Sequence, residues 1–297
     1  MQMENNWKVM KEENGKQHNG QNMLKETGQF PAQDIPNDDE QLTMRDLTVG
    51  YDRIPLIKNI NLGVRPGEIL TLIGPNGSGK STILKTITKQ LKTIGGSVFL
   101  GKESMRELTD SEISRHLSMV MTERIHTELL SGRDVVATGR YPYTGRLGIL
   151  SQQDWKKVDE AIALVHAGEV QQQDFRRISD GQRQRLMLAR AICQDTQVLI
   201  LDEPTSYLDM GFKLDILTTI RMLARKKNLA VIMSLHELDL AQKISDIIAC
   251  VYVFFPDNMM RGGCSGNHQL TLLHCFIPLF KRNDGKCGKL MQEISGM

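Results

Sequence analysis

The chain has 297 residues, of which 40% are hydrophobic, and a formal charge of +2 at pH 7 from 37 basic and 35 acidic side chains. This length allows one substantial core with appendages, and the near balance of charges gives no support for a general nucleic-acid or membrane-binding surface. Five cysteines give no even-numbered disulfide framework, and no apolar run reaches the ~20 residues of a bilayer crossing or resembles a secretion signal, so we expect a cytoplasmic chain.

Residues 1–40 are polar, with Asn-Gly pairs, two prolines and no sustained apolar period. Such a segment buries too little apolar surface to offset the entropy of ordering, so we predict a flexible leader. A wrongly chosen upstream start codon is the alternative, because Met23 or Met44 also offers a start.

Residues 41–253 alternate short apolar runs with amphipathic segments, which is typical of a parallel sheet wrapped by helices. Because the apolar runs lack a polar face, we expect them to be buried on both faces. We predict an α/β fold with strands at Ile69–Ile73, Val198–Leu201, Ala230–Ser234 and Ile247–Val253.

A glycine-rich segment at 74–82 follows the first of these strands and precedes a helix-forming run. Glycines let successive backbone N–H groups turn toward one centre, and the helix adds the positive end of its dipole, so the segment predicts a phosphate cradle. We expect Lys80 to meet the outer phosphates and the Ser81 hydroxyl to face Mg²⁺. A plain glycine-rich turn is the alternative, which the flanking strand and helix disfavour. The predicted cradle consists of Gly74, Asn76, Gly77, Ser78, Gly79, Lys80, Ser81 and Thr82.

Helical periodicity dominates the stretch between this loop and the strand at 198–201. In 154–168, apolar residues at i, i+3, i+7 and i+10 form one stripe, which we interpret as core rather than as a binding surface. A second stripe, at 214–223, leads into three cations at 225–227, and we interpret these as a solvated helix C-terminus rather than a nucleic-acid patch.

A Ser-x-Gly turn at 179–181 opens a strongly helical run and forms a second anion-binding helix start. An ordinary N-cap is the alternative. One ATP cannot use both helix starts of the same subunit if the helical stretch is a separate lobe. We therefore expect Ser179, Gly181 and Gln182 to serve the nucleotide of a partner subunit.

Two carboxylates, Asp202 and Glu203, end the apolar run 198–201. A buried strand tip can hold Asp202 near Mg²⁺ and Glu203 near an attacking water, as ATP hydrolysis requires. Capping of the next helix is the alternative, and the presence of Lys80 in the same chain disfavours it.

Three further residues accompany these motifs, each with an ordinary structural alternative. His236 follows the strand 230–234, where an imidazole can contact a γ-phosphate. Asp209 lies in a tight connection after the carboxylates that suits sensing of a neighbouring subunit. Tyr51 lies before the first predicted strand, and its ring can stack on adenine.

Together these motifs resemble the ATP-binding subunit of an ABC transporter, from about Leu42 to Cys250. The resemblance implies a P-loop NTPase with a RecA-like core, an inserted α-helical subdomain at about 105–192 and a small antiparallel β region. It implies a homodimer that sandwiches ATP, docked on a transmembrane permease at the inner face of the cell membrane. A substrate-binding protein is an indirect partner, and nucleic acid is not one.

The same resemblance implies roles for single residues. The segments Gly139–Tyr143 and Ser179–Arg185 are similar to those of importers of iron chelates, haem and vitamin B12. The implied roles are phosphate binding by Lys80, Mg²⁺ binding by Ser81 and Asp202, polarisation of the water by Glu203 and γ-phosphate contact by His236.

Two positions depart from the family pattern. Thr122 stands where a glutamine usually touches Mg²⁺ and links to the membrane subunit, so either Glu123 or a water substitutes, or that linkage is altered. Thr122 stays in the expected metal set. Asp180 replaces a frequent glycine, and an acid suits a helix start.

Residues 254–297 form an atypical tail where the family has a turn, a strand and closing helices. A divergent folded tail and a disrupted reading frame are the main alternatives. Zinc binding is a third, but the cysteine and histidine spacings match no standard pair of ligand turns.

Two other functions remain open at this stage. A regulatory nucleotide-binding module with little ATP turnover is one alternative, because Thr122 and the tail both depart from the pattern of the transport ATPases. A soluble ABC ATPase of ribosomes or chromosomes usually needs two ATPase modules or a long coiled coil, and the sequence contains neither.

Overall fold

The structure is a computed structural model that describes residues 39–121, 129–145, 147–254, 274–276 and 279–281. All of them belong to one of the two units into which the chain divides, Pro36–Met297. The other unit, Met1–Ile35, lies outside the described residues, as does nearly all of the predicted leader.

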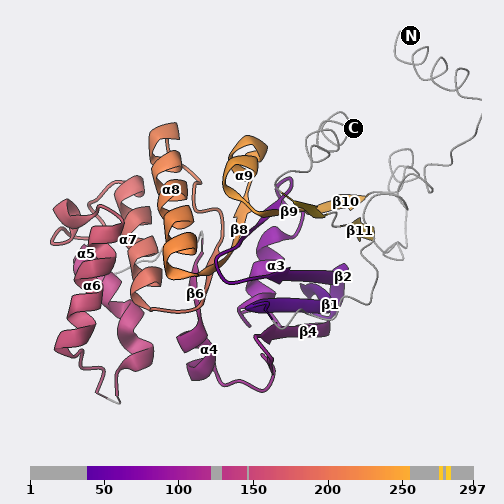
Figure 1. Ribbon diagram of the computed structural model, residues 1–297, viewed down its shortest axis with the longest axis horizontal. Coiled ribbons are helices and arrows are strands. Elements are labelled where there is room, and N and C mark those ends of the chain that lie inside the picture. The colour runs from indigo at the N-terminus through magenta and orange to yellow at the C-terminus, as the bar shows by residue number, and fades with distance from the viewer. Residues whose placement is uncertain (1–38, 122–128, 146, 255–273, 277–278, 282–297) are drawn as a thin grey trace, which may run out of the picture. The chain divides into compact units, whose positions relative to one another are not determined.

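A six-stranded sheet forms the centre of this unit (Figure 1). Its four inner strand pairings are parallel, and β12 joins the edge antiparallel to β9. The strand order is β12 (Leu279–Lys281), β9 (Ile247–Cys250), β3 (Ile69–Ile73), β8 (Ala230–Leu235), β7 (Val198–Leu201) and β6 (Leu117–Val120).

The inner strands are buried on both faces, as the sequence predicts. In β3, Ile69 and Ile73 join one hydrophobic cluster, whereas Leu70 and Leu72 join a second cluster on the opposite face. The first cluster contains the apolar faces of α7 (Asp180–Cys193), α8 (Met210–Lys227) and α9 (Leu238–Ile244). The sheet is therefore the boundary between two cores.

A small antiparallel sheet covers the second core together with α3 (Lys80–Ile87). Its order is β2 (Ile54–Val64), β1 (Leu42–Tyr51), β4 (Gly95–Leu100) and β5 (Glu103–Ser104). The predicted antiparallel β region is thus confirmed.

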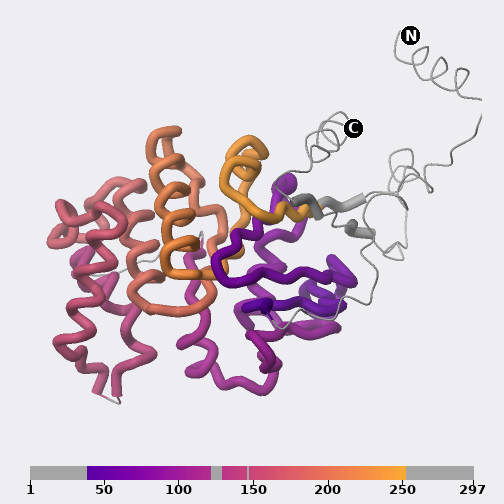
Figure 2. Tube along the Cα trace, viewed as in Figure 1, coloured from indigo at the N-terminus to yellow at the C-terminus, as the bar shows by residue number. Residues whose placement is uncertain are grey.

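The inserted helices gather in one group, away from β1, β2 and β4 (Figure 1). Figure 2 shows the same group as a tube along the Cα trace, in magenta to orange. Four of the described helices begin with a capping box. In this motif a Ser or Thr side chain accepts from the N–H of the third helical residue, whose side chain accepts from the N–H of the Ser or Thr. The elements are α4 (Asp110–His116), α5 (Gly132–Ala137), η1 (Thr138–Tyr143), α6 (Gln152–Leu164), η2 (Gly168–Val170) and α7.

The expected helical subdomain at about 105–192 includes one strand of the central sheet, because β6 pairs with β7. Beyond β9, β10 (Tyr252–Phe254) pairs with β11 (His274–Phe276), and most of the remaining tail lies outside the described residues. Within the described part of the chain, no helix combines the length and apolarity of a membrane span.

Candidate active site

The loop between β3 and α3 has the geometry of a phosphate cradle. Gly77 and Gly79 have φ angles of 78° and 100°, which side chains disfavour. At Gly74 a Cβ would lie 2.0 Å from the Val251 carbonyl oxygen, so only glycine fits there. The buried Ser78 hydroxyl has no hydrogen-bond partner among the described residues, which fits a site that accepts a polar ligand.

Lys80 begins α3 and is almost fully buried. Its ammonium donates hydrogen bonds to the carbonyls of Gly74 at 2.8 Å and Pro75 at 2.9 Å, which tie it to the loop. Burial lowers the pKa of Lys80, whereas the charges of Glu203 and Asp202 act in the opposite direction. The cation therefore lies close to both predicted carboxylates.

Asp202 follows β7 at the carboxyl edge of the sheet and is buried. Its backbone N–H donates to the Val120 carbonyl at 2.8 Å. Its Oδ1 accepts hydrogen bonds from Ser81 Oγ at 3.1 Å and Ser234 Oγ at 2.7 Å. Three elements, α3, β7 and β8, thus meet at one carboxylate.

Glu203 has a left-handed backbone with φ of 49°, which a side-chain-bearing residue rarely adopts. Both of its carboxylate oxygens have partners. Oε1 lies 2.5 Å from His236 Nε2, and Oε2 accepts from Ser206 Oγ at 2.9 Å. The structure thereby brings Glu203 and His236 into contact.

The Ser81 and Asp202 oxygens fit a magnesium ion. Mg²⁺ binds hard oxygen ligands at ~2.1 Å in an octahedron, so neighbouring ligands lie ~3 Å apart. The Ser81 Oγ to Asp202 Oδ1 separation is 3.1 Å. The third expected metal residue, Thr122, and Glu123 lie outside the described residues.

Tyr51 is the last residue of β1, not a residue before the first strand as we expected from the sequence. Its hydroxyl lies 3.2 Å from Thr82 Oγ1, on the helix that follows the loop, and about half of the residue is exposed. The side chain therefore lies beside the phosphate loop, where a ring could meet a base. Asn76 is exposed on the same loop.

Ser179, Gly181 and Gln182 form the start of α7. Ser179 Oγ accepts from the Gln182 N–H at 3.3 Å, and Gln182 Oε1 accepts from the Ser179 N–H at 3.0 Å. A Cβ on Gly181 would lie 3.1 Å from the Phe212 ring of α8, so this position favours glycine. The turn is an N-cap with both hydrogen bonds of a capping box, and it also begins a helix at an exposed position. The ordinary N-cap and the anion-binding helix start are therefore compatible interpretations.

Asp209 is exposed and caps α8 through a hydrogen bond to its Oδ1 from the Phe212 N–H at 3.0 Å. The preceding Tyr207 is 86% exposed and has a left-handed φ of 64°. This connection thus presents polar and aromatic groups to solvent beside the carboxylates.

The sequence assigned no individual role to Ser206, which begins the connection 206–209, or to Ser234, which ends a predicted strand. In the structure Ser206 hydrogen-bonds Glu203, and Ser234 hydrogen-bonds both Asp202 and Glu203. For Ser234 the signal was its place at the carboxyl end of the predicted strand 230–234, the edge of a parallel sheet at which ligands bind. For Ser206 the signal was its place directly after the carboxylates.

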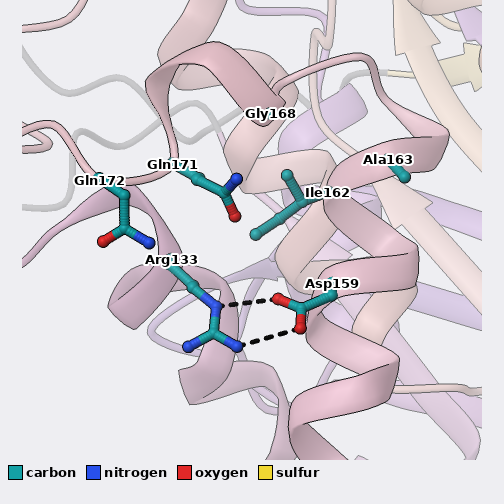
Figure 3. Close-up of a pocket in the computed structure, with 7 residues that line it drawn as sticks. All are labelled: Arg133, Asp159, Ile162, Ala163, Gly168, Gln171 and Gln172. Atoms are coloured by element: carbon teal, nitrogen blue, oxygen red, sulfur yellow. Dashed lines mark hydrogen bonds and ion pairs between the residues drawn. The ribbon is translucent and has the colours of Figure 1, made fainter.

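A cavity of about 410 Å³ lies elsewhere, between α5, α6 and η2 (Figure 3). Arg133 and Asp159 form a two-bond ion pair across one side of it, at 2.8 and 3.1 Å. The lining residues are Arg133, Asp159, Ile162, Ala163, Gly168, Gln171 and Gln172, which include none of the predicted nucleotide residues.

Comparison with known proteins identifies the family. The ABC transporter family model matches residues 57–206, which include the phosphate loop, the α7 start and both carboxylates. The chain is an ABC transporter ATP-binding protein. It is therefore an ABC-type ATPase that binds ATP, and the expected P-loop NTPase fold is confirmed.

Relatives match most of this ABC protein. An uncharacterised ABC transporter ATP-binding protein of Methanocaldococcus jannaschii is 41% identical over 74% of this chain and 78% of its own length. The achromobactin transport ATP-binding protein of Dickeya dadantii is 34% identical, covering 71% and 78%. The iron(3+)-hydroxamate import ATP-binding protein of Bacillus subtilis is 31% identical, covering 69% and 76%.

Solved structures share the fold. A putative metal-chelate type ABC transporter in an inward-facing conformation has a TM-score of 0.64 at 23% identity, over 71% of this chain and 80% of that one. A dimeric ATP-binding cassette with ADP and phosphate has a TM-score of 0.62 at 24% identity, over 71% and 94%.

Proposed function

We propose that this ABC ATPase energises uptake of an iron-siderophore, haem or cobalamin-type substrate. The observation that carries the ATPase assignment is the convergence of Lys80, Asp202, Glu203 and His236 at the carboxyl edge of one sheet. The substrate class is supported by the achromobactin and hydroxamate relatives and by a cobalamin import relative of Halobacterium salinarum, 33% identical over 66% of this chain.

In the proposed reaction a water oxygen attacks the γ-phosphorus and the bond to the β-phosphate oxygen breaks, giving ADP and phosphate. Glu203 orients the water and takes its proton, while Lys80 and His236 stabilise charge on the phosphate oxygens. Ser81 and Asp202 would hold Mg²⁺, which neutralises phosphate charge when bound. In the structure both Glu203 oxygens are engaged, so the water must compete with His236 or Ser206.

We propose a homodimer as the working form, with the α7 start of one subunit facing the phosphate loop of the other. Solved cassettes of the same fold that are dimeric support a dimer. A transmembrane permease would hold the dimer at the inner face of the cell membrane, and a substrate-binding protein would act through that permease. The transport and import names of the relatives support the permease partner.

ATP turnover by the purified chain tests the reaction. The wild type should hydrolyse ATP, and Glu203→Gln should lose on the order of 10²-fold or more in rate while still binding nucleotide, since the amide cannot take a proton. Release of phosphate and fluorescence of a bound nucleotide analogue measure the two properties. Equal turnover by both proteins would reject the role of Glu203, and a wild type that binds without turnover would favour a regulatory module.

Purification from membranes tests the transport assignment. The tagged chain should carry a multi-spanning membrane protein with it, and uptake of a ferric siderophore should stop in cells that carry only Glu203→Gln. Recovery of ribosomes or DNA in place of a membrane protein would favour a non-transport ABC ATPase.

A further inference from the structure

Ser234 occupies the penultimate position of β8 and is completely buried. Its hydroxyl makes two hydrogen bonds, both to the carboxylate pair. It donates to Asp202 Oδ1 at 2.7 Å and accepts from the Glu203 backbone N–H at 2.8 Å. A single hydroxyl therefore joins the proposed metal ligand to the proposed base.

The register of the sheet places the hydroxyl there. β7 and β8 are parallel with Leu201 opposite Met233, so the next residues, Asp202 and Ser234, lie side by side where β7 ends. His236 is the first residue after β8, so Ser234 and His236 lie on either side of the strand end. His236 contacts Glu203 from beyond the strand end, and Ser234 contacts it from within.

These bonds fix the two groups that chemistry needs. Asp202 Oδ1 is shared between Ser234 and Ser81, so the Ser234 bond sets the direction in which the carboxylate faces α3. Glu203 holds a left-handed φ of 49°, and its N–H bond to Ser234 stabilises that strained backbone. Without the hydroxyl, one buried N–H and one carboxylate oxygen would each lose a partner.

We propose that Ser234 is a positioning residue for ATP hydrolysis, which aims Asp202 toward its cation and holds Glu203 in its working conformation. The inference rests on the proposed roles of Asp202 and Glu203. A buried hydroxyl that contributes only to folding is the competing explanation, and the experiment below separates the two.

The test compares Ser234→Ala with Ser245→Ala in the full chain. Ser245 is equally buried, and its hydroxyl lies 2.6 Å from Thr71 Oγ1. Ser245 precedes the amino-terminal end of β9, at the edge of the sheet opposite to the carboxylates. Ser234→Ala should lower kcat by ~10–100-fold, the usual cost of losing a group that orients a metal ligand. Ser245→Ala should keep the wild-type kcat, and both variants should shift the urea midpoint by similar amounts.

A second readout does not depend on turnover. Mg²⁺ should raise the affinity of the protein for a fluorescent ATP analogue, and the Mg²⁺ concentration that gives half of this rise is measured. That concentration should increase by ~10-fold in Ser234→Ala and stay unchanged in Ser245→Ala. Ser234→Thr keeps a hydroxyl and should recover most of both properties. Ser234→Cys has nearly the same side-chain volume as the wild type and only a weak hydrogen-bond donor, so it should lose activity as Ser234→Ala does. Ser234→Cys replaces Ser234→Ala in both measurements if Ser234→Ala does not fold.

Each outcome decides the matter. The inference would be overturned if Ser234→Ala kept the wild-type kcat and Mg²⁺ dependence, or if Ser245→Ala showed the same losses as Ser234→Ala. In both cases a Glu203→Gln protein without turnover would leave the proposed active site standing. A Glu203→Gln protein as active as the wild type would overturn the proposed site and this inference together.

Discussion

Gly74 shows how one residue of the phosphate loop depends on a distant strand. Val251 lies beyond the end of β9, and its N–H donates to the Ile73 carbonyl at 2.7 Å. This bond brings the Val251 carbonyl against the Gly74 α-carbon, and a Cβ would also lie 2.9 Å from Ser78 Oγ. The conformation of the loop at Gly74 therefore depends on the position of the segment after β9.

Gly74→Ala should displace the loop and weaken nucleotide binding. We expect a loss of ~1–3 kcal/mol in unfolding free energy from overpacking, and at least ~10-fold weaker binding of a fluorescent ATP analogue. Gly145→Ala is the matched control, because that glycine is exposed with open space around its α-carbon, and it should change stability by less than ~0.5 kcal/mol. Unchanged nucleotide affinity in Gly74→Ala would contradict the role of this contact.

Among the elements, η1, α6 and α7 are joined by one buried guanidinium. Arg140 Nε donates to Asp154 Oδ1 at 2.9 Å, and Nη1 donates to the Cys193 carbonyl at 2.9 Å. The guanidinium lies 4.0 Å from the centre of the Tyr143 ring. The pKa of Asp154 is lowered, chiefly by its hydrogen bond from Ser151 at the α6 cap. Within the importer-like segment 139–143, Arg140 therefore has a structural role.

Arg140→Ala should loosen the helical group. It leaves the Asp154 carboxylate buried without its counter-ion, which costs ~3–5 kcal/mol in unfolding free energy. Asp159→Ala is the control: it breaks the ion pair with Arg133, but Asp159 is 54% exposed, so we expect less than ~1 kcal/mol. Urea unfolding followed by circular dichroism measures both. Equal losses would mean that burial of the Arg140 pair adds nothing.

At the scale of the whole molecule, two of the described helix starts are the ones predicted to meet a nucleotide, those of α3 and α7. At the α3 start Ser81 hydrogen-bonds Asp202, whereas the α7 start lies on the inserted helical group, with Gly181 against Phe212. If each nucleotide needs one start from each subunit, a mutation in either start disables both sites of a homodimer.

Mixing two inactive proteins tests this composite site. Lys80→Ala and Ser179→Arg should each lack turnover alone, but a mixed dimer contains one site built from two unaltered halves. We expect the mixture to recover measurable ATP hydrolysis, rising with the square of protein concentration at low concentration. Recovery should be absent when Lys80→Ala is mixed with Glu203→Gln, because both changes affect the same half-site. If the mixture of Lys80→Ala and Ser179→Arg hydrolysed no ATP, the face-to-face arrangement of the two subunits would be contradicted.

The sequence by itself predicted four strands of the central sheet, the glycine-rich loop at 74–82 and the carboxylate pair after 198–201, and it indicated the α/β fold. Each of these is recorded within about ten neighbouring residues, as a run of apolar side chains or a fixed spacing of glycines and charges. Strands β3 and β7 have the expected ends, and β8 extends one residue further, to Leu235. The strand expected at 247–253 was too long: β9 ends at Cys250, and Tyr252–Phe254 belongs to a separate strand, β10, which pairs with β11.

Only the tertiary structure decided which distant residues meet. The contacts of Ser234 with Asp202, of Tyr51 with Thr82 and of Gly74 with Val251 all join segments at least 31 residues apart. The first follows from the register of two parallel strands, the second from the folding of the antiparallel sheet onto α3, and the third from a strand that arrives late in the chain. None has a local sequence pattern, because the free energy that fixes each contact comes from the packing of whole elements.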